Sequence, residues 1–223
     1  MTPVERSGED YVALSAALLM AAQGGEVGVA ATVVVPRTLV LGSAQSFEDA
    51  ADAEIPVVKR GTGGGAVLCD AGVLLVDVAV PAGHALAPED VTDAYRPFGE
   101  LLVAVLADLG IAARTVTVAE SRSLDDTHKA AARRACWAGL SPYEVVLLDG
   151  RKVVGLAQRR RRGAVLYQIA VHVTTPPTLV ADYLVDGAAL SHWLTATAAL
   201  TEVESPGVLW DTLRAPLLAR LTS

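Results

Sequence analysis

At 223 residues, 52% of them hydrophobic, the chain can bury one sizeable core, and we expect a single domain over residues 1–223 whose C-terminal portion, 178–223, is helical and forms no separate accessory domain. The net charge of −7 argues against a general nucleic-acid surface, and Asp70 and Asp77 interrupt the longest candidate for a membrane helix, so we expect neither nucleic acid nor a membrane as a partner. Two cysteines, Cys69 and Cys136, are too few for a disulfide framework, and charged side chains stand where a signal peptide would be apolar, so we expect a cytoplasmic protein.

The N-terminal part of the chain predicts one helix followed by short strands. The helix covers 10–23, where apolar side chains recur at helical spacing between Asp10 and Gly24. β-Branched residues over 27–42, with a corner at Pro36, favour two short strands or one bent strand. The polar residues 43–54 favour a loop or a short helix, and the apolar runs 57–60, 66–69 and 73–80 favour strands.

A glycine-rich loop separates two of these strands, in the segment Arg60-Gly61-Thr62-Gly63-Gly64-Gly65-Ala66. Glycine permits positive φ and lets a ligand approach the main chain, so consecutive N–H groups can point at one anionic or polar group, and Arg60 adds a charge. The spacing meets the dinucleotide fingerprint, but a strand follows instead of a helix, and no Gly-Lys-Ser/Thr completes a phosphate-binding loop. We expect either a ligand-facing loop or a glycine-rich turn without a ligand.

The C-terminal part predicts a long helix, a hairpin and further helices. Residues 91–109 have apolar side chains at helical spacing, with Asp90 as a cap, Gly110 as the stop and a bend at Pro97. Residues 120–134 favour a mobile loop or a marginal helix leading to Cys136. Asp149-Gly150 predicts a hairpin of strands 143–148 and 151–158, and another strand covers 165–173. Residues 179–221 favour two helices separated by Pro206-Gly207.

Several segments, in order, resemble the lipoate-protein ligase and octanoyltransferase superfamily. The glycine-rich loop is one of them, Gly42 and Gln45 are similar to its Gly-x-x-Gln corner, and 91–96 is similar to the start of its central helix. Segments 136–145 and 149–160 are closest in motif to the cysteine-dependent octanoyltransferases. The resemblance covers roughly 10–173 and implies an α+β fold, the biotin/lipoate ligase-like catalytic domain with mixed, antiparallel-rich sheets covered by helices.

The resemblance implies two catalytic residues. Lys152 follows a tight turn, shares a strand face with Val154 and matches the family's catalytic lysine, so a partly desolvated ammonium could bind an acyl carbonyl or phosphate. Position alone also suits an ordinary lysine on an exposed hairpin. Cys136 matches the nucleophile of the cysteine-dependent enzymes, and its alternative is a small buried hydrophobe. The substrate-binding residues implied are Arg60, Gly61, Thr62, Gly63, Gly64, Gly65, Ala66, Gln45, Gly155 and Ala157.

A run of four arginines, Arg159, Arg160, Arg161 and Arg162, follows the family motif. It favours either a solvated strand end or a docking site for an acidic acyl carrier protein or lipoyl domain. The four histidines show no metal-ligand spacing, and we expect no metal. Two positions depart from the family pattern. Cys69 stands where the family has a histidine, and its side chain either fills the core or forms a redox pair with Cys136. Residues 167–170 stand where the family has a His-Gly-Ser run.

The function implied is attachment of an octanoyl or lipoyl group to a lysine of a lipoyl domain or a glycine cleavage H-type carrier protein. We favour transfer through a Cys136 thioester, with an acyl carrier protein as a possible donor and with Lys152 holding the acyl carbonyl. Besides the match at Cys136, Ser43-Ala44 stands where the ligases of the family have Arg-Asn, which favours transfer over ligation. The first alternative is an ATP- and Mg²⁺-dependent lipoate-protein ligase that forms lipoyl-AMP, with a separate accessory subunit. The second alternative is a noncatalytic lipoate-binding protein.

Overall fold

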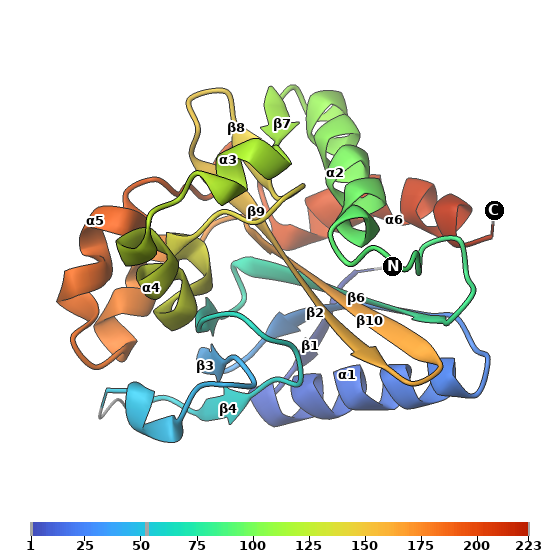
Figure 1. The fold of residues 1–223 in the computed structure, drawn as a ribbon, viewed down its shortest axis with the longest axis horizontal. Helices are drawn as coiled ribbons and strands as arrows, with labels where there is room; N and C mark the ends of the chain where they lie inside the picture. The colour runs from blue at the N-terminus through green and yellow to red at the C-terminus, as the bar shows by residue number, and fades with distance from the viewer. Residues whose placement is uncertain (1, 52–53, 223) are drawn as a thin grey trace.

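The computed structural model describes residues 2–51 and 54–222, and their strands form two sheets. The larger sheet has the order β1-β2-β6-β10-β9-β8-β7, and the smaller has the order β4-β3-β5. Pairs β1–β2 and β3–β4 are parallel, and the other described pairs are antiparallel. Helices lie around both sheets (Figure 1), so the predicted α+β class with antiparallel-rich sheets is confirmed. The strands are β1 Val4–Arg6, β2 Gly28–Val34, β3 Thr38–Leu41, β4 Val57–Lys59, β5 Val67–Cys69, β6 Val73–Pro81, β7 Ala113–Thr115, β8 Val145–Leu147, β9 Lys152–Arg161 and β10 Ala164–His172.

Helix α1, Gly8–Gln23, packs on one face of the larger sheet, against β2, β6 and β10. It begins before the predicted Asp10 because the Ser7 side chain caps it by accepting a hydrogen bond from the Asp10 N–H at 3.1 Å. Tyr11 and Ser15 are four residues apart and therefore share the face that meets the sheet. This face brings two hydroxyl groups to the centre of the fold.

Helix α2, Arg96–Asp108, begins later than the predicted start at Val91. Asp90 caps a 3₁₀ turn instead, because its carboxylate accepts hydrogen bonds from the N–H groups of Thr92 and Asp93. Pro97 therefore stands in the first turn of α2, where no intrahelical N–H is lost, and the predicted bend at this position is wrong. The inner face of α2 packs into the larger hydrophobic core.

Two helices replace the predicted mobile loop or marginal helix over 120–134. Helix α3, Val118–Arg122, has a capping box between Thr117 and Glu120, and helix α4, Asp126–Arg134, is capped by Asp125. Each helix is short, but its capping side chain satisfies N–H groups that would otherwise lack partners. The end of α4 leads directly into Cys136, so this nucleophile candidate follows an ordered helix.

The C-terminal region contains less α-helix than predicted over 177–190, and its last helix begins at Pro206. Residues 177–190 form mainly 3₁₀ turns, followed by the short helix α5, Ser191–Leu194. Pro206 starts helix α6, Pro206–Leu221, instead of separating two helices, because a proline is favourable in a first turn. Leu209, Leu213 and Leu217 of α6 pack into the same core as α2.

The remaining local predictions agree closely with the structure. The corner at Pro36 separates β2 from β3, and Gly150, at a φ of 89°, turns the β8–β9 hairpin. Residues 47–49 form a 3₁₀ turn within the predicted loop or short helix over 43–54, of which Asp52 and Ala53 lie outside the described residues. Within the part of the chain that the structure describes, no helix has both the length and the apolar character needed to cross a bilayer.

Candidate active site

The glycine-rich loop and the Cys136 segment are joined through their main chains. The Ala66 N–H donates to the Arg134 carbonyl at 2.9 Å, and the Cys136 N–H donates to the Ala66 carbonyl at 3.0 Å. A Cβ on Gly65 would lie 2.6 Å from the main-chain nitrogen of Ala135, which is too close for any side chain. Gly65 is therefore required for the close approach that brings the loop to Cys136.

Arg60 supports the loop from inside. Its Nη2 donates to the carbonyls of Gly63 and Gly65, each at 2.9 Å, and the side chain is only 6% exposed. Gly64 adopts a φ of 93°, which a residue with a side chain disfavours. Thr62 is also buried, and its hydroxyl donates to the Gln168 amide oxygen at 2.5 Å. Arg60 and Thr62 thus hold the shape of the loop, and Arg60 also lines a cavity below Cys136.

Gln45 lies behind the site. Its amide oxygen accepts a hydrogen bond from the Gly42 N–H at 3.0 Å, and its amide nitrogen donates to the Arg134 carbonyl at 3.1 Å. The side chain connects the end of β3 to the residues that precede Cys136, and it is not among the described residues that line the two cavities beside Cys136. Gln45 is thus in a supporting position, bonded to main-chain groups on both sides.

Lys152, the first residue of β9, is 1% exposed and has a full set of partners. Its Nζ donates to the carbonyls of Cys136 and Gly139, each at 3.0 Å, and forms an ion pair with Glu144 Oε2 at 2.7 Å. An ammonium group has three hydrogens, so these contacts use all of them. Lys152 therefore ties the turn that carries Cys136 to the hairpin.

Glu144 is the site residue that the sequence analysis missed. It is also 1% exposed, and besides Lys152 it accepts hydrogen bonds from the N–H groups of Ser141, at 2.7 Å, and Leu156, at 3.1 Å. The signal was available in the hairpin, since pairing of Val145 with Val154 places the residue before β8 near the start of β9. A buried carboxylate opposite a buried lysine neutralises the charge of the site without solvent.

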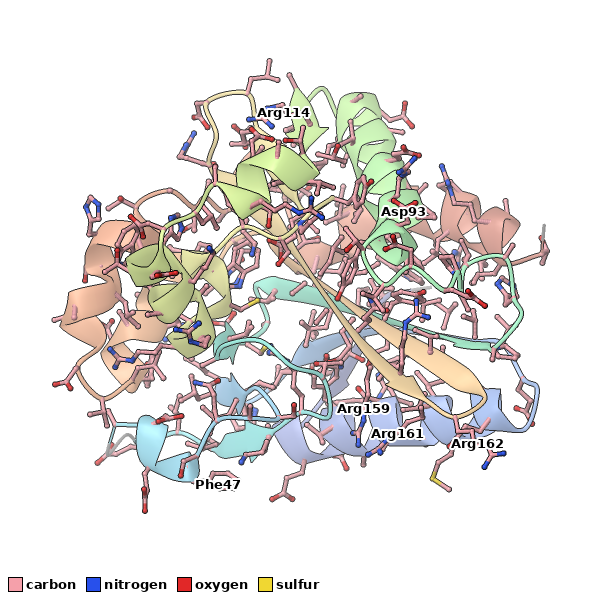
Figure 2. The ribbon with its side chains drawn as sticks, in the orientation of Figure 1. Phe47, Asp93, Arg114, Arg159, Arg161 and Arg162 are labelled. Atoms are coloured by element: carbon pink, nitrogen blue, oxygen red, sulfur yellow. The ribbon has the colours of Figure 1, made fainter. Side chains whose placement is uncertain are left out.

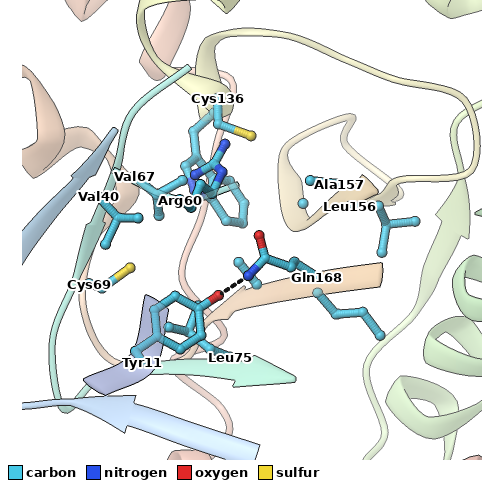
Figure 3. Close-up of a pocket in the computed structure, with 14 residues that line it drawn as sticks. Tyr11, Val40, Arg60, Val67, Cys69, Leu75, Cys136, Leu156, Ala157 and Gln168 are labelled. Atoms are coloured by element: carbon cyan, nitrogen blue, oxygen red, sulfur yellow. Dashed lines mark hydrogen bonds between the residues drawn. The ribbon is translucent and has the colours of Figure 1, made fainter. Parts of the chain in front are cut away.

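Cys136 is half-buried at the junction of two cavities. The inner one extends from Cys136 to Tyr11 and Gln168, with mostly apolar walls (Figure 3). The outer one, of about 980 Å³, borders the glycine-rich loop at residues 63–65. Gly155 lines the inner cavity and Ala157 lines both. The loop, Cys136 and the two β9 residues implied by the family resemblance thus meet at one place.

The four arginines do not form one patch. Arg159 rests against Gly61, where an added Cβ would collide with its guanidinium group, and Arg161 and Arg162 lie near it along α1 (Figure 2). Arg160 is on the opposite strand face because side chains alternate, and its Nε donates to Gln158 at 2.9 Å. The docking hypothesis therefore applies to Arg159, Arg161 and Arg162, whereas Arg160 lines a separate groove beside Tyr95.

Cys69 lies in β5, within the core of the smaller sheet, and lines the inner cavity. Burial raises the pKa of its thiol to about 12, so the thiol stays protonated at neutral pH. Both cysteines are free thiols. Among residues 2–51 and 54–222, no group of three or more His, Cys, Asp and Glu side chains is arranged to hold a metal ion.

Comparisons with known proteins agree with this geometry. An octanoyltransferase LipM of Brevibacillus brevis is 34% identical over 137 residues, which cover 59% of this chain and 49% of the relative. The chain thus spans about half the length of the curated relatives it matches. A bipartite lipoate protein ligase of Thermoplasma acidophilum, solved in a study that includes its E2 lipoyl domain, has a TM-score of 0.74 at 21% identity, covering 99% of this chain and 82% of that one. A lipoate-protein ligase A bound with ATP has a TM-score of 0.73 at 21% identity, covering 99% and 84%.

The two structural similarities confirm the predicted biotin/lipoate ligase-like fold. The model of one protein family, described as the lipoyl protein ligase A/B catalytic domain, matches residues 9–196, which include the glycine-rich loop, Cys136 and Lys152. The matched region is most of the chain, and this chain therefore belongs to the lipoyl protein ligase A/B catalytic domain family.

Proposed function

We propose that the chain transfers an octanoyl or lipoyl group to a lysine of a carrier protein, through a thioester on Cys136. The observation that carries this proposal is the position of Cys136 between a mostly apolar cavity and a wider one. The inner cavity is lined mainly by apolar side chains, which suit the alkyl part of an acyl group. An acyl chain in it would place its carbonyl at Cys136, and the outer cavity would admit the donor and then the acceptor.

Two displacements at the acyl carbon make up the reaction. The Cys136 thiolate attacks the donor thioester, forming a new S–C bond, and the donor leaves as a thiolate that takes up a proton. The carrier lysine then attacks as a free amine, an amide C–N bond forms, and the Cys136 S–C bond breaks. The proton lost by the amine restores the Cys136 thiol. No ATP is needed, because the energy of the donor thioester drives amide formation.

Lys152 acts in this scheme by positioning Cys136. Its ammonium group holds the Cys136 and Gly139 carbonyls, and Glu144 holds the ammonium group. Direct contact between Lys152 and an acyl carbonyl, which the family resemblance implies, requires one of the three present contacts to be exchanged for it. The loop residues 63–65 line the wall of the outer cavity next to this turn.

We further propose that the donor or acceptor is an acidic carrier protein, an acyl carrier protein as donor and a lipoyl domain or H-type protein as acceptor. Arg159, Arg161 and Arg162 support this, since none has an ion-pair partner among the described residues although the chain is acidic overall. Unpaired cations attract an acidic partner and orient it. The two free cysteines agree with a reducing, cytoplasmic location.

The ATP-dependent ligase is the second candidate, and the outer cavity favours it. This cavity opens beside the glycine-rich loop, where a nucleotide would lie. The lining side chains with a formal charge are Lys129 and Glu144, so Lys129 would hold a phosphate there. ATP with Mg²⁺ would supply the activation of free lipoate as an adenylate.

The test is intact-protein mass spectrometry of the wild type and Cys136→Ser after incubation with octanoyl-acyl carrier protein, without ATP. We expect an octanoyl adduct on the wild type that is absent from Cys136→Ser and that disappears when a lipoyl domain is added. Cys69→Ser is the matched control, because its buried thiol should not accept the acyl group. No adduct on the folded wild type, together with ATP consumption driven by lipoate, would replace transfer by ligation. Lipoate binding without either reaction would leave the noncatalytic alternative.

A further inference from the structure

We propose that Gln168 closes the inner cavity and thereby sets the longest acyl chain that the site accepts. This inference rests on the proposed function, because it assigns the inner cavity to the acyl chain. Gln168 lies on β10 and lines the inner cavity, with its amide directed at the Tyr11 hydroxyl (Figure 3). Its side chain is 7% exposed and belongs to a network of buried polar groups.

The network fixes the orientation of the Gln168 amide. Its nitrogen donates to the Tyr11 hydroxyl at 2.8 Å and to the Ser15 hydroxyl at 3.1 Å, and its oxygen accepts from the Thr62 hydroxyl. Ser15 in turn donates to Asp77 at 2.6 Å. Both amide hydrogens are therefore used; the three partners of Gln168 come from α1 and the glycine-rich loop, and Ser15 is in turn held by Asp77 of β6. A side chain held from three directions forms a rigid wall and not a movable gate.

Only one layer of side chains separates the inner cavity from a second opening. A groove of about 690 Å³ lies between α1 and the glycine-rich loop, and Ser15, Lys59 and Arg159 are among its lining residues. Ser15 contacts Gln168 directly, and Arg60 lines both the groove and the inner cavity. Gln168 on the cavity side and Ser15 on the groove side therefore form part of the wall between the two spaces.

The hydrogen bonds of Gln168 also disfavour the binding of longer acyl chains. A methylene group that displaced the Gln168 amide would leave the hydroxyl groups of Tyr11, Ser15 and Thr62 without their partner in a buried site. Unsatisfied buried polar groups are costly, so a longer chain cannot gain from burial by pushing the wall aside. A chain that stops short of the wall leaves the network intact.

The variants Gln168→Ala and Gln168→Ser shorten the wall and connect the cavity with the groove. We would measure the affinities of hexanoic, octanoic, decanoic, dodecanoic and tetradecanoic acids by calorimetry, for the wild type and each variant. We expect affinity to rise with length to a maximum in the wild type, and the maximum to move to a longer acid in both variants. Each methylene newly buried should add about fourfold in affinity. Gln168→Ser keeps a hydroxyl partner for the network if Gln168→Ala fails to fold.

Gln168→Leu is the matched control, since leucine keeps most of the side-chain length without the amide. It should retain the wild-type maximum, whereas a shift as large as that of Gln168→Ala would overturn the wall as the cause. An unchanged maximum in folded Gln168→Ala or Gln168→Ser would also overturn the inference, as would a wild type that binds none of the acids. The binding measurement does not require acyl transfer. A shift in binding without any Cys136 adduct would therefore refute the proposed function alone, and an adduct with no shift would refute this inference alone.

Discussion

Replacing Lys152 with methionine should destabilise the fold far more than replacing its neighbour. Lys152→Met leaves Glu144 as a buried carboxylate with only the N–H groups of Ser141 and Leu156 as partners. Removing one partner of a buried ion pair costs about 3–5 kcal/mol. For a chain of this size, that free energy corresponds to a fall in melting temperature of roughly 6–20 °C. The measurement is urea and thermal unfolding followed by circular dichroism.

Arg151→Met is the control for this prediction. Arg151 is adjacent in the chain and also forms an ion pair, with Asp149 at 2.7 Å, but both side chains are about half exposed. Exposed pairs contribute about 0–1 kcal/mol, so this variant should unfold close to the wild type. The double variant Lys152→Met/Glu144→Gln removes both buried charges and should regain part of the stability that Lys152→Met loses. A loss below about 1 kcal/mol in Lys152→Met, or strict additivity in the double variant, would refute the reasoning.

Two further predictions concern the loop and the buried carboxylate. Gly65→Ala should lower the free energy of unfolding by about 1–3 kcal/mol and slow acylation of Cys136, because the new Cβ would lie 2.6 Å from a main-chain atom of Ala135. Gly63→Ala is the control, because a Cβ there meets nothing within 4 Å. Equal urea unfolding midpoints for the two variants would contradict this prediction. Burial raises the pKa of Asp77 from 3.8 to about 6. The folded chain therefore retains a proton that the unfolded chain loses, and this carboxyl lowers stability as pH rises from about 4 to about 6. Asp77→Asn should gain up to about 3 kcal/mol relative to the wild type over that interval, and a difference independent of pH would show that the carboxyl does not titrate there.

The local elements were well predicted because their signals act over a few residues. Helix α1, the Asp149-Gly150 turn and the glycine-rich loop could all be predicted from side-chain periodicity or permitted φ values within a short segment. Errors occurred where capping competed with periodicity, as at Asp90, whose carboxylate caps a 3₁₀ turn and delays α2. Over 120–134 the polar composition suggested a mobile loop or a marginal helix, and the structure has two short helices that capping groups stabilise.

The sequence by itself determined the fold class, the candidate nucleophile Cys136 and the loop that borders it, because each depends on residue types in fixed local order. Only the tertiary structure decided that Lys152 is fully bonded to Glu144 and two carbonyls, and that Gln45 lies behind the site. It also decided one wall of the inner cavity, where Gln168 bonds to Tyr11 across 157 residues of sequence. Such contacts depend on strand order and on how α1 packs on the sheet, and no local pattern encodes either of these.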